Sequence, residues 1–193
     1  INSSEVLKES EIVHTDEFVD ANEKPSVAVR KGKNSSMGMA IQSVKSGKAD
    51  AIVSAGNTGA LMAMAKLFLR PIDGINRPAI AAYFPTITGE SCMLDLGANI
   101  DCDAKNLVQF AFMGQAFANI VMGVDNPSIS LLNIGEEEQK GLDYIKEASQ
   151  ILSDLKSQIN YAGFIEGDKI AQGISDVIIA DGFSGNVSLK TAE

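Results

Sequence analysis

Two segments of the sequence repeat one pattern of residue types that suits the binding of a small anion. The pattern is D-x-I-[VI]-x-x-G-x-[ST]-G, and it occurs in residues 50–59 and 176–185. In each copy an apolar run ends in two glycines that flank a hydroxyl residue, Thr58 in the first and Ser184 in the second. Glycines let the backbone turn and let an anion come close, while hydroxyl and N–H groups at a helix start donate hydrogen bonds.

One such turn alone is typical of a tight connection between a strand and a helix, but two matching copies favour a binding site, with phosphate as the natural ligand. The candidate binding residues of the two turns are Gly56, Asn57, Thr58, Gly59, Asp181, Gly182, Ser184 and Gly185.

A further candidate lies in Asp95–Asn99, where an acidic and an amide side chain follow an apolar run. Asp95 has apolar neighbours, so its carboxylate must find hydrogen-bond donors or change its pKa. It either ties down the N–H groups of its own loop or takes part in binding, and the sequence leaves both interpretations open. We assign Asp95 and Asn99 to the substrate-binding candidates.

Lys140 follows an acidic cluster, Glu136–Glu138, behind another apolar run. Acidic residues at a helix start complement the helix dipole, which accounts for the three glutamates but not for the lysine. Lys140 is either one more surface cation or a cation that faces the same anion as the glycine turns.

The counts of histidine and cysteine restrict the chemistry. The single histidine, His14, and the absence of a G-x-S-x-G motif argue against a serine triad. The sequence has only two cysteines, Cys92 and Cys102, in addition to this histidine, so no His/Cys metal cluster can be assembled. Neither cysteine has an evident activating base, so both are interpreted as packing residues.

The net charge of −9 argues against nucleic acid as the main partner. Residues 24–48 nevertheless contain six basic residues and no acidic one. This stretch is either a solvated helix face or a landing site for an anionic ligand or acidic partner. We assign Arg30, Lys31 and Lys33 to the second possibility as a candidate docking site.

The elements that must position these residues alternate between strand and helix patterns, which predicts an α/β fold with a mostly parallel mixed sheet and helices on both faces. The predicted strands are Glu11–Thr15, Ala51–Ser54, Ala79–Phe84, Cys92–Leu96, Ser128–Ile134, Tyr161–Ile165 and Asp176–Ala180. Residues 85–91 are too few for a crossover helix, so they predict one antiparallel pair.

The predicted helices carry apolar stripes that should face this sheet. Met37 and Leu61 each begin a run with apolar residues at i, i+3, i+4 and i+7. Ala104–Met122 is apolar nearly all round, and Gly141–Ser157 is an ordinary amphipathic segment. Without a linker or a sharp change of composition, residues 1–193 are predicted to form a single α/β catalytic region.

Several long motifs, in this order, resemble the phosphate acyltransferase family of bacterial phospholipid synthesis. They are K-N-S-S-M at 33–37, S-A-G-N-T-G-A-L at 54–61, R-P-A-I at 77–80, L-D-L-G-A-N at 94–99, N-I-G-E-E-E-Q-K-G at 133–141, E-G-D at 166–168 and D-G-F-S-G-N-V-S-L-K-T at 181–191. The resemblance extends over essentially the whole chain. It implies an enzyme that converts acyl-[acyl-carrier-protein] and inorganic phosphate into acyl phosphate and free carrier protein.

The same resemblance implies a fold similar to those of isopropylmalate dehydrogenase and phosphate acetyltransferase, and neither metal nor organic cofactor. It implies a homodimer in the cytoplasm that attaches peripherally to the inner face of the cytoplasmic membrane. Within the motifs it places active-site roles on Lys140 and Asn186. It also implies that the chain is a central fragment, without the N-terminal strand and C-terminal helices of the family, through which membrane contact would be made.

As a hypothesis, Thr58 and Ser184 with nearby N–H groups bind phosphate, Lys140 offsets its charge, and Asn186 donates to the developing oxyanion. Asp95 and Asp181 then orient Lys140 or accept from Asn99 and Asn57, because carboxylates would repel the phosphate dianion. Two alternatives remain, a short-chain phosphate acyltransferase that uses acyl-coenzyme A and a non-catalytic scaffold at the membrane. A decarboxylating dehydrogenase is disfavoured, since neither an arginine cluster nor three carboxylates for Mg²⁺ are evident.

Overall fold

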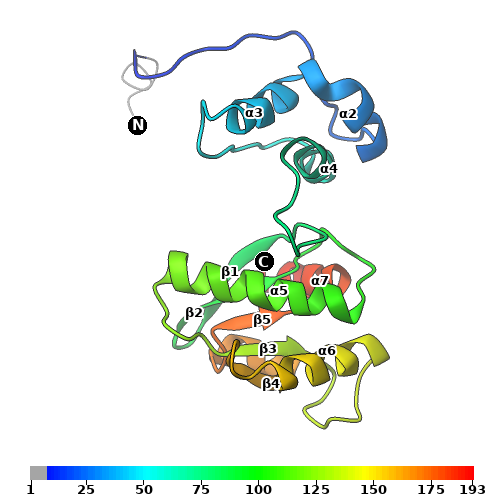
Figure 1. The fold of residues 1–193 in the computed structure, drawn as a ribbon, viewed down its shortest axis with the longest axis vertical. Helices are drawn as coiled ribbons and strands as arrows, with labels where there is room; N and C mark the ends of the chain where they lie inside the picture. Colours follow the sequence, from blue (N-terminus) through cyan, green and yellow to red (C-terminus); the bar gives the residue numbers. More distant parts are fainter. Residues whose placement is uncertain (1–7) are drawn as a thin grey trace. The chain divides into compact units, whose positions relative to one another are not determined.

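The computed structural model describes residues 8–193, which form two compact units (Figure 1). The first, called the helical unit, ends at Arg70, and the second, called the sheet unit, is Pro71–Glu193. This division leaves the prediction that residues 1–193 form one catalytic region untested.

Three short α-helices build the described part of the helical unit. They are α2 (Pro25–Lys31), α3 (Ser36–Lys45) and α4 (Thr58–Leu69), with a 3-10 turn, η1 (Gly32–Asn34), between the first two. Their apolar stripes pack on one another around Ala28, Met37, Ile41, Ala60 and Met64. Side-chain caps fix two of the starts, because Ser35 accepts from the Gly38 N–H and Asn57 accepts from the Ala60 N–H.

The strands predicted at Glu11–Thr15 and Ala51–Ser54 are wrong, because neither segment is a strand in the structure. A strand is held by hydrogen bonds to a neighbouring strand, and in the described part of the helical unit neither segment has one. Val53 is 100% exposed despite its apolar side chain. The expectation that the stripes of α3 and α4 face a sheet is therefore also wrong, since they pack on α2 and on each other.

A five-stranded mixed sheet forms the centre of the sheet unit, with the order β1-β2-β5-β3-β4. The strands are β1 (Ala81–Thr86), β2 (Gly89–Leu94), β3 (Ile129–Leu132), β4 (Tyr161–Ile165) and β5 (Val177–Ile179). β1 and β2 form an antiparallel hairpin, and β2, β5, β3 and β4 are parallel neighbours. The predicted mixed sheet and its antiparallel pair at residues 85–91 are confirmed.

Helices cover both faces of this sheet (Figure 1). Alternate residues of a strand point to opposite faces, so Leu94 joins a core with α5 (Ala104–Phe117) and α6 (Asp143–Asp154). Met93 instead joins a core that includes η3 (Gly167–Gln172) and partly buried Leu189 of α7 (Gly182–Ala192). The predicted arrangement of helices on both faces is confirmed.

The helix predicted over Ala104–Met122 is present but changes its winding near the end. It begins at a capping box formed by Asp103 and Asn106 and continues beyond α5 as a π-helical turn, η2 (Ala118–Met122). Gly123 ends it with a φ of 69°. No helix within residues 8–193 is long and apolar enough to cross a membrane.

Candidate functional site

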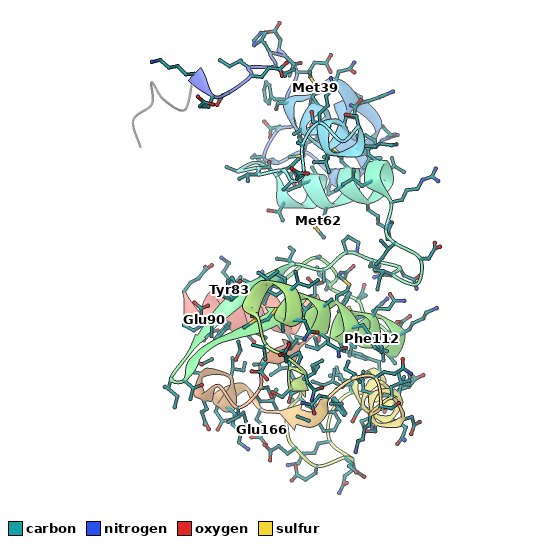
Figure 2. All side chains as sticks on the ribbon, turned by 60° about the vertical axis from the view of Figure 1, so that its left-hand side comes forward. Met39, Met62, Tyr83, Glu90, Phe112 and Glu166 are labelled. Carbon is teal, nitrogen blue, oxygen red and sulfur yellow. The ribbon has the colours of Figure 1, made fainter. Side chains whose placement is uncertain are left out.

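Four polar residues follow the four parallel strands of the sheet unit. Asp95 comes directly after β2, Asn133 after β3, Glu166 after β4 (labelled in Figure 2), and Asp181 two residues after β5. The carboxyl ends of parallel strands meet at one edge of a sheet, where ligands of open α/β folds bind. This edge, called here the polar edge, is the candidate site of the sheet unit.

Asp95 is fully buried and its carboxylate organises the loop behind β2. Its oxygens accept from the N–H groups of Ile80, Gly97, Ala98 and Asn99 at 2.9, 3.3, 3.0 and 2.7 Å. They also accept from Nδ2 of Asn99 at 2.8 Å, as predicted for this pair. Of the two interpretations that the sequence left open, the contacts support the structural one.

Asp181 caps the start of α7 in the same manner. One carboxylate oxygen accepts from the N–H groups of Phe183 and Ser184 at 3.0 and 2.9 Å. The other accepts from the Ser184 hydroxyl at 2.8 Å and the Tyr144 hydroxyl at 3.1 Å. The Gly182 N–H donates to the carbonyl oxygen of Asn99 at 2.8 Å. The donors that the sequence assigned to phosphate at this turn are therefore already paired.

The two glycines of this turn serve close packing. A Cβ on Gly185 would lie 1.9 Å from the carbonyl oxygen of Asp95, and one on Gly182 would lie 2.6 Å from that of Asn99. Both obstacles are backbone atoms, which cannot move aside as a side chain can. The structure thus explains Gly182 and Gly185 by the approach of α7 to the 95–99 loop, rather than by room for an anion.

The loop behind β3 is closed by Asn133, which is 6% exposed. Its Nδ2 donates to the carbonyl oxygens of Gly135 and Lys140, both at 3.0 Å. Gly141 has a φ of 95°, and a Cβ there would lie 2.0 Å from Oδ1 of Asn133. The N-I-G-E-E-E-Q-K-G motif is therefore a closed loop that fixes the backbone carrying Lys140.

The Lys140 ammonium group pairs with the carboxylate of Glu137 at 2.8 Å, and both side chains are about half exposed. This hydrogen bond and the charge of Glu137 raise the pKa of Lys140, and the charge of Glu166 adds to the effect. Neither Asp95 nor Asp181 pairs with it, so the expectation that they orient Lys140 is wrong. Their carboxylates are committed to loop N–H groups and hydroxyls instead.

Asn186, on α7, reaches the loop behind β2. Its Nδ2 donates to the carbonyl oxygen of Leu96 at 3.1 Å. Gly97, with a φ of 132°, permits this contact, since a Cβ there would lie 3.1 Å from Nδ2 of Asn186. One amide proton of Asn186 is thereby fixed in place, and the amide retains a second proton for another acceptor.

Tyr144 is a residue of the polar edge that sequence reasoning missed. It lies in the first turn of α6, and its hydroxyl bridges to Asp181 at the start of α7. Burial, followed by the charge of Asp181, raises the pKa of Tyr144 to about 12. Burial likewise raises the pKa of Cys102 to about 11, which agrees with a packing role for this thiol. The sequence carried no signal for Tyr144, because only the fold brings α6 to α7.

The other glycine turn lies in the helical unit, at the start of α4. Asn57 caps the helix through Oδ1, which accepts from the Ala60 N–H at 2.9 Å. Its Nδ2 donates to the carbonyl oxygens of Asp20, Ala21 and Glu23 at 3.3, 3.0 and 2.9 Å. The expectation that Asn57 donates to Asp95 or Asp181 is therefore wrong, because its amide protons are used within the helical unit.

The first two N–H groups of α4, those of Thr58 and Gly59, have no hydrogen-bond partner within the described chain. A hollow of about 310 Å³ borders this turn and is lined by Gly56 and by residues of α3 and the 52–55 segment. Ser36 and Ser54 bring hydroxyl groups to it. The N–H groups of Thr58 and Gly59 are thus exposed and unpaired in the described chain, whereas the N–H of Gly56 donates to Oγ of Ser54 at 3.3 Å.

Two of the three basic residues predicted as one docking site, Lys31 and Lys33, border different hollows, and Arg30 lines neither of them. Arg30 and Lys31 lie in the last turn of α2, and Lys33 lies in η1. Lys31 lines a hollow together with three acidic residues, Asp16, Glu17 and Glu23. Lys33 lines another hollow together with Lys45. Within residues 8–193 no group of three or more His, Cys, Asp or Glu side chains is placed to hold a metal ion.

Comparison with known proteins identifies the family. A family model described as "Fatty acid synthesis protein" matches residues 1–193. The chain belongs to this family. Relatives named phosphate acyltransferase agree with the motif resemblance, including one from Rhodospirillum centenum, 56% identical over 184 residues, and one from Parvibaculum lavamentivorans, 56% identical over 189 residues. They cover 95% and 97% of this chain, which spans about half, 52%, of each relative.

Solved structures show the same fold at low sequence identity. The phosphotransacetylase EutD from Staphylococcus aureus superposes with a TM-score of 0.66 at 17% identity, covering 98% of this chain and 69% of that chain. A phosphotransacetylase from Streptococcus pyogenes superposes with a TM-score of 0.62 at 21% identity, covering 91% of this chain and 63% of that chain. The predicted likeness of fold to phosphate acetyltransferases is confirmed.

Proposed function

We propose that this chain is the part of a phosphate acyltransferase that transfers an acyl group from acyl carrier protein to inorganic phosphate. The observation that carries the proposal is the 56% identity, over almost the whole chain, to relatives named phosphate acyltransferase. The unpaired donors at the start of α4 support it independently, because a phosphate-using enzyme needs such a group of donors.

In the proposed reaction a phosphate oxygen attacks the thioester carbonyl carbon. A C–O bond forms, the C–S bond breaks, and the carrier thiol leaves with the proton that hydrogen phosphate gives up. Phosphate is itself the nucleophile, so the reaction requires correct placement of the two reactants rather than a protein nucleophile, a metal or an organic cofactor. Correct placement of two reactants can supply about 7–11 kcal/mol of the barrier.

We assign phosphate binding to the turn at the start of α4. The N–H groups of Thr58 and Gly59 and the Thr58 hydroxyl offer donors at the positive end of the helix dipole. The cap of this helix is the neutral side chain of Asn57, so no carboxylate repels the phosphate there. In this proposal the equivalent turn at Gly182–Gly185 supports the structure of the polar edge and does not bind phosphate.

We assign catalytic roles to Lys140 and Asn186. Lys140 offsets negative charge in the reaction. To do so its ammonium group leaves its exposed partner, Glu137, and an exposed ion pair of this kind contributes little in water. Asn186 donates its second amide proton to the oxyanion, while its first is held by Leu96. Asp95 and Asp181 hold the two loops on which this geometry depends.

Three further expectations of the resemblance belong to the proposal. The whole protein is a homodimer, it resides in the cytoplasm, and it attaches peripherally to the inner face of the cytoplasmic membrane. Cross-linking in solution tests the homodimer and sedimentation with lipid vesicles tests the membrane attachment, both separately from the reaction.

The test is formation of acyl phosphate from palmitoyl-acyl-carrier protein and labelled phosphate, with the whole protein. We expect Asn186→Ala to lower kcat by about 10²–10³, the usual effect of losing one oxyanion donor. Lys140→Ala should lower kcat. Lys146→Ala is the matched control, because Lys146 pairs with Asp143 at 2.9 Å with the same i,i+3 spacing. Equal activity of all four proteins would contradict the assigned roles.

The alternatives are separated by the acyl donor. A preference for acyl-coenzyme A over the carrier thioester would identify the short-chain enzyme. No phosphate-dependent loss of either thioester would identify a non-catalytic scaffold.

A further inference from the structure

A hollow in the helical unit gathers two basic side chains around an aromatic one. It has a volume of about 430 Å³ and is lined by Lys33, Gln42, Lys45, Ser46 and Phe68. The residues come from η1, from the end of α3 and from the last turns of α4. We call it the lysine groove.

The two lysines of the groove have no ionic partner within the chain that the structure describes. No carboxylate in residues 8–193 lies within ion-pair distance of Lys33 or Lys45. Two unpaired ammonium groups beside one hollow favour the binding of an anionic ligand, because no carboxylate of the described chain pairs with them there. Lys31 differs, because its hollow contains Asp16, Glu17 and Glu23.

The floor of the groove is ordered and partly apolar. Nε2 of Gln42 donates to the carbonyl oxygen of Lys33 at 2.7 Å and to that of Gly38 at 3.2 Å, which ties η1 to α3. Phe68 is half-buried against the core of the helical unit. A ligand in the groove therefore meets two exposed lysine side chains and one aromatic surface.

We infer that the lysine groove docks an acidic helix of the acyl carrier protein, with carboxylates on Lys33 and Lys45 and an apolar side chain on Phe68. This inference rests on the proposed function, which supplies an acidic partner protein. It also moves the docking site away from Lys31, whose acidic neighbours would repel such a helix. Because the chain as a whole carries a charge of −9, a local basic groove is needed to steer an acidic partner to the right place.

The test compares charge reversal at the groove with charge reversal beside it, in the whole protein. Lys33→Glu/Lys45→Glu should weaken binding of the acyl carrier protein, measured by fluorescence anisotropy at low salt, at least about ten-fold. Lys31→Glu, the control in the acidic hollow, should stay within about two-fold. With a neutral small acyl thioester, kcat/KM of both variants should equal that of the parent, and thermal unfolding should confirm that both fold.

The outcomes separate the groove from the reaction. If the parent binds the carrier protein but forms no acyl phosphate, the proposed function fails while the binding comparison still tests the groove. Equal weakening by both variants, no weakening by the groove variant, or no binding by the parent would overturn the inference. It would be overturned as well if the groove variant lost only its binding to anionic lipid vesicles, because the groove would then contact a membrane.

Discussion

The two glycine turns share a sequence pattern, yet their helix starts differ in charge and in free donors. At the start of α7 the cap is the Asp181 carboxylate, which accepts from two N–H groups and two hydroxyls. At the start of α4 the cap is the Asn57 amide, and the first two N–H groups have no partner in the described chain. At the start of α7 a carboxylate already accepts from the N–H groups, whereas at the start of α4 the N–H groups of Thr58 and Gly59 are exposed.

The difference shows that one pattern of glycines and hydroxyls can serve two physical purposes. Gly182 and Gly185 let a helix approach a loop backbone, while a Cβ on Gly56 or Gly59 would meet side-chain atoms at 3.3 or 3.1 Å. The capping residue decides the rest. Asp181 precedes the glycine pair of the second copy, whereas Asn57 lies within the glycine pair of the first. A carboxylate at the cap satisfies donors that an anion would use.

The largest expected effect is a difference in stability between glycine variants of the two turns. Gly185→Ala places a Cβ against the Asp95 backbone and should lower the free energy of unfolding by about 3 kcal/mol, the upper end of overpacking costs. Gly59→Ala meets side-chain atoms, the Cγ of Pro25 at 3.1 Å and Oδ1 of Asn57 at 3.5 Å, and should change the free energy of unfolding by less than about 1 kcal/mol. Urea unfolding measures both, and equal losses would break the distinction between the turns.

A second test exchanges the caps. Asn57→Asp removes the donor of three backbone carbonyls and should cost about 2 kcal/mol of unfolding free energy. Asp181→Asn keeps an acceptor for the two N–H groups and can donate to the hydroxyls, so it should cost about 1 kcal/mol. If urea unfolding showed a larger loss of stability in Asp181→Asn than in Asn57→Asp, the two caps would not be specialised as described.

Tyr144→Phe tests the hydroxyl that joins α6 to Asp181. Loss of this hydrogen bond should lower the free energy of unfolding by about 1 kcal/mol. If the bond positions α7, kcat for acyl phosphate formation should fall with KM unchanged. Tyr161→Phe is the control, because its hydroxyl bonds to Ser149 at 2.8 Å, away from the turn. A similar fall of kcat in both variants would remove the positioning role.

The smallest effect concerns the ionisation of Tyr144. Burial and the negative charge of Asp181 disfavour the phenolate and raise the pKa of Tyr144 to about 12. Asp181→Asn removes the charge but not the burial, so the pKa should fall only part of the way toward its ordinary value. Ultraviolet titration in a Tyr83→Phe background measures it, with Tyr161, whose pKa burial raises to about 12, as the unaffected reference. An unchanged Tyr144 pKa would contradict the contact.

The sheet unit was predictable because its strands carry local signals. The alternating apolar runs placed all five strands, including β4 at Tyr161–Ile165, and the short 85–91 link predicted the hairpin. In the helical unit the same signals failed at Ala51–Ser54, because a strand also needs a partner that local sequence does not supply.

The candidate site was predictable in its residues but not in their bonds. Asp95 and Asn99 form the expected pair, and Lys140 and Asn186 keep the catalytic roles as predictions. The cap that Asp181 forms with the N–H groups of Phe183 and Ser184 is local. The role of Tyr144 instead depends on a contact between residues 37 positions apart, which no local pattern encodes. The closed 133–141 loop likewise depends on where the Asn133 side chain points.

The central claim is that the turn at Gly56–Gly59, and not the one at Gly182–Gly185, binds inorganic phosphate. Proline is tolerated in the first position of a helix, and the extended backbone of Asn57 suits a following proline, so Thr58→Pro removes the hydroxyl and one free N–H while preserving α4. Calorimetric titration with phosphate should show affinity reduced at least about ten-fold in Thr58→Pro and changed less than about two-fold in Ser184→Ala. Parent-like affinity in Thr58→Pro, together with lost binding in Ser184→Ala, would contradict the account.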